Sequence, residues 1–256
     1  MFNIIWAKVV LIFQEKFTLN YVKTVLVRYV RFPRYSLLEA LMQMFSMQLP
    51  FFYLNFINDQ SESGFLLNSM KFSQIPIVLI ASSISQVYYG FVKKDLNDGT
   101  LRDTASDIIL KLYNFIVLPL IVCIPISPFI FEKYLGLNWR HSGELMQSII
   151  PYTIGIIIFA IFSVNFYAKE KFAQSLKIQF IILFVRVTAI VIGHLFFKNS
   201  TLEIFFLASA FIYLLFSHYA LKVINFKWQM ILNRIYNQKR YTIAALALTI
   251  LFYILL

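Results

Sequence analysis

Residues 176–197 read LKIQFIILFVRVTAIVIGHLFF, an apolar stretch with a formal charge in its middle, at Arg186. A helix needs roughly 20 apolar residues to cross a hydrocarbon core about 30 Å thick, and this stretch is long enough. Five other stretches are comparable and a last one, at the C-terminus, is shorter: 37–57, 66–92, 105–131, 144–167, 202–223 and 241–256. The sequence therefore predicts an all-α fold, a polytopic transmembrane bundle of six or seven helices.

The composition is also typical of a membrane protein. Hydrophobic residues make up 60% of the chain and charged residues 14%, and the mean hydropathy is +0.73. A soluble domain normally has about a quarter of its residues charged. This composition therefore disfavours a soluble fold.

The net charge of +11 is unevenly distributed along the chain. If the first full span enters from the cytoplasm, the outside segments hold only Lys133, Arg140 and Lys198, with Lys71 near a helix start. This asymmetry is what the positive-inside rule expects, so the basic residues indicate topology and contact with lipid headgroups rather than nucleic-acid binding. The inside segments hold Lys16, Lys23, Arg28, Arg31, Arg34, Lys93, Lys94, Arg102, Lys169, Lys171, Lys177, Lys222, Lys227, Arg234, Lys239 and Arg240.

These patterns predict four parts along the chain. A basic interfacial segment occupies 1–36, and a bundle of six transmembrane helices occupies 37–223. A basic amphipathic segment on the cytoplasmic surface follows at 224–240, and a short final transmembrane helix at 241–256. The connections between spans are too short to form a folded extramembrane domain.

We expect neither a metal site, a cofactor nor an enzymatic activity. Cys123 is the single cysteine, so no disulfide and no cysteine-ligated metal site can form. The three histidines are widely separated in the sequence. No glycine-rich phosphate loop, no carboxylate pair on a loop and no grouping of serine, histidine and acid is present.

Two of the expected spans carry polar residues at helical spacing. Residues three and four positions apart share a face of a helix, and lipid offers them no hydrogen bonds. Such stripes either pack against neighbouring helices or line a wet cavity, and their recurrence on successive helices favours a cavity. The first stripe is Glu39, Gln43, Ser46 and Pro50, and the second is Lys71, Gln74, Ser82 and Ser85.

Arg186 is the strongest single indication of function. An Arg near the centre of a transmembrane helix costs about 2.5–3.5 kcal/mol on insertion scales, so it should pair with an anion or face a hydrated path. Gln179 and Gly193 lie two turns to either side on the same face, so Gln179 is expected to supply a second donor to the substrate cavity and Gly193 to leave room beside Arg186. The functional interpretation is that Arg186 binds an anionic substrate through its planar guanidinium. The structural interpretation is that it bonds carbonyls of a neighbouring helix, or Glu39.

Several short motifs occur in a characteristic order and spacing: RFPRYS (31–36), SMQLP (46–50), GF (64–65), PIVLIAS (76–82), SQVY (85–88) and the loop GLNWRHSGE (136–144). Together they resemble the second lobe of bacterial polysaccharide-biosynthesis flippases. These transporters belong to the multidrug/oligosaccharidyl-lipid/polysaccharide exporter superfamily, and the resemblance covers about residues 28 to 165.

The resemblance implies a bacterial inner-membrane transporter with two lobes around a central cavity. Its substrate would be an undecaprenyl-pyrophosphate-linked oligosaccharide, moved from the inner to the outer leaflet, and Arg186, Lys71 and the polar stripes would line the cavity. The chain matches only the second lobe. It would therefore pair with a separate first lobe, form a homodimer, or be an inactive truncated fragment.

Two other classes stay open. A cation-coupled drug antiporter of the same superfamily would need buried carboxylates within the spans, and only Glu39 comes near that requirement. A membrane enzyme of envelope assembly would need a large outside loop or catalytic His and Asp near the interface, and the short loops disfavour it.

Overall fold

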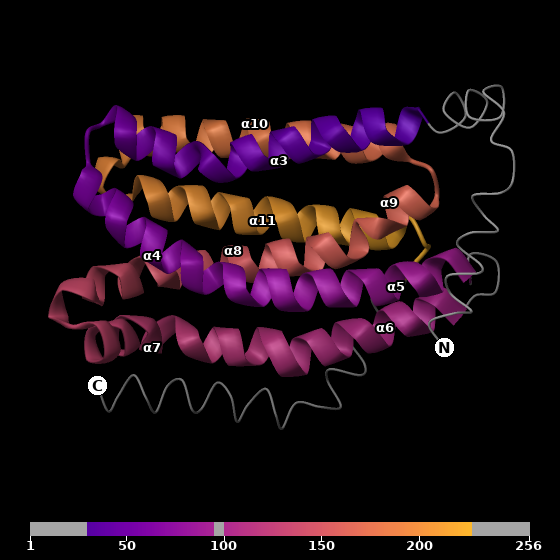
Figure 1. The fold of residues 1–256 in the computed structure, drawn as a ribbon, viewed down its shortest axis with the longest axis horizontal. Coiled ribbons are helices and arrows are strands. Elements are labelled where there is room, and N and C mark those ends of the chain that lie inside the picture. The colour runs from indigo at the N-terminus through magenta and orange to yellow at the C-terminus, as the bar shows by residue number, and fades with distance from the viewer. Residues whose placement is uncertain (1–29, 95–99, 227–256) are drawn as a thin grey trace, which may run out of the picture.

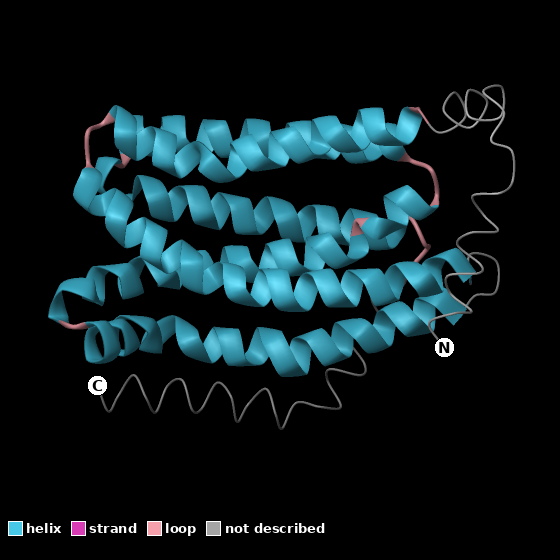
Figure 2. Cartoon of the chain, viewed as in Figure 1, coloured by secondary structure: helices cyan, strands magenta, loops and turns pink. Residues whose placement is uncertain are grey.

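The computed structural model describes residues 30–94 and 100–226. Within these ranges every regular element is a helix, and the long helices run side by side (Figures 1 and 2). The predicted all-α class is confirmed. The final helix at 241–256 and almost all of the segments 1–36 and 224–240 lie outside the described residues.

Where the structure describes them, the connections between the long helices are short. α3 begins at Arg31, earlier than the predicted span start at 37, so the motif RFPRYS belongs to this helix. The short elements at the connections are η3 (Leu137–Trp139), α9 (Val164–Ala168) and η4 (Lys198–Ser200). The longer ones are α3 (Arg31–Phe56), α4 (Gln60–Pro76), α5 (Ser82–Lys94), α6 (Thr100–Leu112), α7 (Leu118–Leu135), α8 (Arg140–Phe162), α10 (Phe172–Phe196) and α11 (Thr201–Lys222).

Five helical runs in the described part of the chain are long and apolar enough to cross a membrane. They are Gln60–Val92, Leu101–Leu135, Leu137–Ala168, Phe172–Phe196 and Lys198–Lys222. α3 has 26 residues and packs beside α10, but its glutamines and Glu39 make it less apolar than the other five. The structure thus supports a multi-pass membrane protein with five such helices, and a sixth of similar length alongside them.

Two of these runs contain a π-helical turn close to a proline. η1 (Ile77–Ala81) joins α4 to α5 directly after Pro76, and η2 (Tyr113–Val117) joins α6 to α7 just before Pro119. Proline has no N–H and its ring crowds the carbonyl four residues earlier, which for Pro119 is Phe115 within η2. A local widening of the helix accommodates that conflict. Both runs remain continuous helices across the π turn.

α8 forms the centre of the bundle. It packs against α11, α7 and α4, while α10 lies between α11 and α3. The most apolar stretch of the α8 run is 61% buried within the protein, against 19% for the α4–α5 run. The side chains that fill this centre are fully buried and apolar or aromatic, among them Ile149, Ile156, Ile161, Phe205 and Tyr213. The α4–α5 run and the α6–α7 run, which is 22% buried, are therefore peripheral, and so is α3, which packs mainly on α10.

The turn between α3 and α4 is encoded locally. Asn58 adopts a left-handed conformation with φ of 59°, which asparagine tolerates better than most residues. Asp59 follows as the N-cap of α4, and its carboxylate accepts a hydrogen bond of 2.9 Å from the backbone N–H of Glu62. These two residues end one helix and start the next in the opposite direction.

The two ends of the bundle differ in charge. Lys169, at the start of the α9–α10 turn, donates to the carbonyl of Val223 at 3.1 Å, and Arg102 donates to the carbonyl of Ile224 at 3.3 Å. Both cations therefore bind the C-terminal end of α11, where free carbonyls and the helix dipole favour positive charge. At the opposite end, where α10 meets α11, the acidic side chains Asp59, Glu62 and Glu203 line one pocket.

Candidate functional site

Arg186 lies in the interior of the bundle. Its side chain is 1% exposed, and its guanidinium donates hydrogen bonds to the hydroxyls of Ser209 on α11, at 2.9 Å, and Ser46 on α3, at 2.8 Å. Ser209 in turn donates to the carbonyl of Phe205 at 2.6 Å. Arg186 thus connects three helices: its own α10, α3 on one side and α11 on the other.

Three aromatic rings surround the same guanidinium. Its central carbon lies 4.8 Å from the ring centre of Phe205, 5.1 Å from that of Tyr152 and 5.6 Å from that of Tyr213. The negative face of an aromatic ring attracts a cation, and the attraction is stronger where water is excluded. Hydroxyls and rings together therefore solvate a charge that the bilayer would not tolerate.

The groups around Arg186 belong to the bundle itself. Its neighbours are serine hydroxyls and aromatic rings of its own bundle, rather than the carbonyls or Glu39 that the structural interpretation named. Gln179 is also buried, at 5% exposure, and its Nε2 has no hydrogen-bond partner in the part of the chain that the structure describes. Gly193 packs against Thr201 of α11, so it permits close helix packing rather than leaving open space. Substrate binding by Arg186 or Gln179 stays a prediction.

Glu39 is buried near the start of α3. It accepts a hydrogen bond from the hydroxyl of Tyr167 on α9, while its Oε1 has no hydrogen-bond partner among the described residues. On the same predicted stripe Ser46 and Pro50 are also buried, whereas Gln43 is exposed. The first stripe therefore divides between the interior of the bundle and its surface.

The second stripe lies mainly on the surface. Lys71, Gln74 and Ser82 are exposed along the α4–α5 run, and Ser85 is half-buried. Ser85 donates to the carbonyl of Ser82 at 3.1 Å, within its own helix. In Figure 1 α3 and the α4–α5 run lie toward the viewer and diverge from their shared turn. The structure thus brings Gln43 and the second stripe onto two neighbouring peripheral helices.

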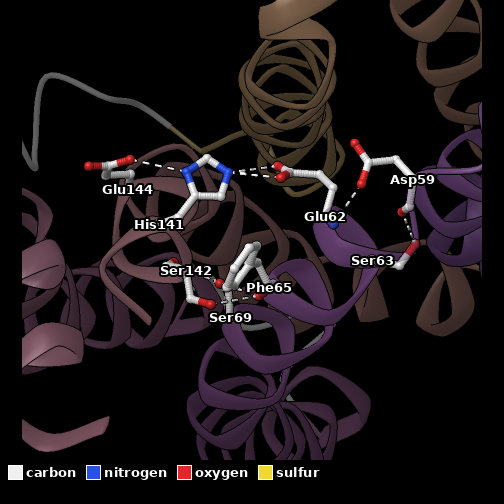
Figure 3. Close-up of polar contacts among 8 residues, drawn as sticks. All are labelled: Asp59, Glu62, Ser63, Phe65, Ser69, His141, Ser142 and Glu144. Carbon is white, nitrogen blue, oxygen red and sulfur yellow. Dashed lines mark hydrogen bonds and ion pairs between the residues drawn. The ribbon is translucent and has the colours of Figure 1, made fainter. Parts of the chain in front are cut away.

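A polar cluster at the α3–α4 turn was not anticipated from the sequence (Figure 3). His141, at the start of α8, lies between two carboxylates: its Nε2 is 2.8 Å from Glu62 and its Nδ1 is 3.1 Å from Glu144. Beneath it Ser142 donates to the carbonyl of Phe65, at 3.1 Å, and Ser69 donates to the carbonyl of Ser142, at 2.7 Å. The sequence does place charged residues in the turns near 59–62 and 140–144. An up-and-down bundle brings these two turns to the same end.

A second polar contact lies near the opposite end of the bundle. The hydroxyl of Tyr88 on α5 donates to Asn165 Oδ1 at 3.0 Å, and Asn165 Nδ2 donates to the carbonyl of Ala220 at 3.1 Å. All three residues are fully buried. Asn165 thus connects α5, α9 and α11.

Within the described ranges no group of three or more His, Cys, Asp or Glu side chains is arranged to hold a metal ion. Comparison with protein-family models, with curated proteins and with solved structures finds no match to this chain.

Proposed function

We propose that this chain is one lobe of a membrane transporter that moves lipid-linked oligosaccharides across the bilayer. The observation that carries the proposal is the exposed polar surface of the α4–α5 run, in a bundle whose helices are long enough to span a membrane. This surface, with Gln43 of α3, is called the polar face below; it consists of Gln43, Lys71, Gln74, Ser82 and Ser85.

Physical chemistry decides what the polar face can contact. Hydrocarbon gives no hydrogen bond to an amide, and an ammonium group in contact with lipid is more costly still. The polar face must therefore be covered by water or by another protein surface. A cavity between two lobes would provide both water and a facing protein surface. The second lobe would be a separate chain or a second copy of this one.

The substrate class rests on the residue types together with the motif resemblance. Lys71 supplies a cation with three donors for a pyrophosphate, and the amides of Gln43 and Gln74 can both donate to and accept from sugar hydroxyls. Because the guanidinium of Arg186 is already solvated within the bundle, Lys71 is the better candidate for the anion-binding role.

Water access to the polar face is the first test. In a Cys123→Ser background, Gln74→Cys and Ser82→Cys should react with a charged, membrane-impermeant thiol reagent. Phe184→Cys is the matched control, because Phe184 is 71% exposed on the apolar outer surface of α10. It should stay unreactive. Equal protection at all three positions would contradict a wet cavity.

Transport is the second test. The full chain, reconstituted into vesicles, should bring a fluorescent undecaprenyl-pyrophosphate-linked oligosaccharide to the leaflet where an added quencher reaches it. Lys71→Gln should slow this transfer without changing thermal unfolding. A folded chain whose polar face is wet, but which transfers no such lipid even when a first lobe is supplied, would contradict the substrate assignment.

A cation-coupled antiporter is the second candidate, and one observation favours it. Glu39 is a buried carboxylate, and one of its oxygens accepts no hydrogen bond from residues 30–94 or 100–226, which makes it a suitable site for a coupling proton or cation. Glu39→Gln would then abolish efflux driven by a proton or sodium gradient. In a flippase without such coupling, the same change would leave transfer intact.

A further inference from the structure

A polar pocket opens at the end of the bundle where α3 turns into α4 and α10 turns into α11. Its volume is about 460 Å³. Tyr53, Thr201 and Asn199 contribute polar groups to its wall. Its charged and titratable lining residues are Asp59, Glu62, His141, His194, Lys198 and Glu203.

An apolar groove of about 360 Å³ adjoins this pocket between α3 and α10. Tyr53 and His194 line both cavities, so the groove begins where the pocket ends. These two side chains are held by hydrogen bonds: the Tyr53 hydroxyl donates to Thr201 at 3.2 Å and lies 3.4 Å from His194 Nδ1. The rest of the groove is aliphatic or aromatic: Leu49, Phe52, Phe56, Val187, Ile190, Val191 and Leu195.

The charges of the pocket are incompletely balanced by the protein. Glu62 is paired with His141, and one Asp59 oxygen is used by the α4 cap. Glu203 is half-buried in the pocket wall, and its carboxylate forms no hydrogen bond or ion pair with the other described residues. A half-buried carboxylate without a partner is costly, so this wall of the pocket is suited to a ligand that donates hydrogen bonds and carries positive charge.

Lys198 gives the same pocket a site of opposite charge. Its ammonium group can bind a phosphate, while the carboxylates can bind an amine. The adjoining groove offers apolar contacts along two helices to a hydrocarbon chain. One molecule with a primary amine, a phosphate and an acyl chain would satisfy all three surfaces.

We propose that the pocket and the groove together form one binding site for a phospholipid whose headgroup ends in a primary amine. The ammonium binds Glu203 and Asp59, the phosphate lies near Lys198, and an acyl chain follows the groove between α3 and α10. A choline headgroup fits less well, since its methylated nitrogen has no N–H to donate to a carboxylate. The site is independent of the polar face and of the proposed transport function.

Native mass spectrometry of the full chain tests the proposal, with phosphatidylethanolamine, phosphatidylcholine and phosphatidylglycerol of identical acyl chains. The ethanolamine lipid should bind about tenfold more tightly than the other two, the effect of one additional charge-assisted hydrogen bond. Equal binding of the three would overturn the proposal and indicate ordinary lipid contact.

Different variants test the binding of the headgroup and the binding of the acyl chain. Glu203→Gln should remove the preference for ethanolamine over choline while leaving choline binding unchanged. Asp59→Asn should reduce the preference and keep the α4 cap, because asparagine is also a good N-cap. A preference unchanged in both folded variants would overturn the headgroup assignment.

Val191→Trp should fill the groove and weaken all three lipids. Its matched control is Ile181→Trp on the same helix, since the two positions are 49% and 46% exposed and Ile181 lies outside the groove. Equal lipid binding by these two variants, with equal thermal unfolding, would overturn the assignment of the groove to the acyl chain.

Discussion

Arg186 shows how a single charge can be stable inside a membrane bundle. Two hydroxyls and three rings surround it, each from a helix that must be in place for the contact to form. We expect Arg186→Ala to lower the free energy of unfolding by about 3 kcal/mol, because it leaves both a cavity and two serine hydroxyls without their donor. Unfolding of the purified protein by increasing SDS in detergent micelles measures this loss.

Arg186→Met is the informative companion variant. It keeps most of the volume and removes the charge, and replacing a buried charge by a well-packed apolar side chain is often nearly neutral. The loss should therefore stay near 1 kcal/mol. A methionine variant as unstable as the alanine variant would contradict this account. A methionine variant that is stable but does not transport would show that Arg186 binds the substrate.

Asn165 should contribute more to stability than its partner Tyr88. Tyr88→Phe removes one hydrogen bond, whereas Asn165→Ala leaves both the Tyr88 hydroxyl and the Ala220 carbonyl unpaired. We expect losses of about 1 and about 2 kcal/mol, with a coupling near 0.6 kcal/mol in a double-mutant cycle. Additive losses would mean that the hydrogen bond between the two side chains does not contribute.

The sequence could identify Arg186 as unusual because a charge within an apolar run stands out on composition alone. It could not identify Ser46 and Ser209 as its partners, since helical periodicity shows which residues share a face and not which helix meets that face. The polar pocket was missed for the same reason. Its residues come from three separate turns, and only the up-and-down packing of the helices brings them together.

At the scale of helices, Gly143 sets the distance between α7 and α8. A Cβ added there would lie 2.5 Å from the carbonyl oxygen of Ser127 and closer still to Pro128 Cα, and both are backbone atoms that cannot easily move. Ser127 also donates to the carbonyl of Gly143 at 2.8 Å, so separating the helices breaks that hydrogen bond. Gly143→Ala should therefore destabilise the bundle by about 2 kcal/mol in the same SDS titration.

Gly90 provides the control for this prediction. It lies within α5, and an added Cβ would meet no atom within 4 Å. Gly90→Ala should be neutral or stabilising by up to about 1 kcal/mol, because alanine has the better helix propensity. If both glycine variants behaved alike, close packing of α7 on α8 would not be the cause.

Hydropathy predicted where the helical runs lie, but it did not predict their internal geometry. The predicted span 176–197 corresponds to α10, Phe172–Phe196, and the predicted span 202–223 to α11, Thr201–Lys222. Pro76 and Pro119 lie next to the two π turns, but a proline in the sequence does not show that a π turn will form within a continuous helix. Whether a proline kinks its helix or is accommodated by a π turn depends on how neighbouring helices pack against the flanking turns. A single sequence does not contain that information.

At the scale of the whole molecule, the charge asymmetry predicts one orientation in the membrane. Lys169 and Arg102 lie at the end of the bundle with the C-terminus of α11, and Lys198 and Arg140 lie at the opposite end, near the polar pocket. The positive-inside rule places the Lys169 end in the cytoplasm. The amine-lipid site would then open toward the outer leaflet.

Two single-cysteine variants in a Cys123→Ser background test this orientation. Asn199 and Gln174 are both exposed and lie near opposite ends of α10. In intact cells an impermeant thiol reagent should label Asn199→Cys and leave Gln174→Cys untouched until the membrane is opened. The reverse pattern would contradict the orientation. Labelling of both sites in intact cells would contradict the stronger claim that α10, with Arg186 at its centre, crosses the membrane.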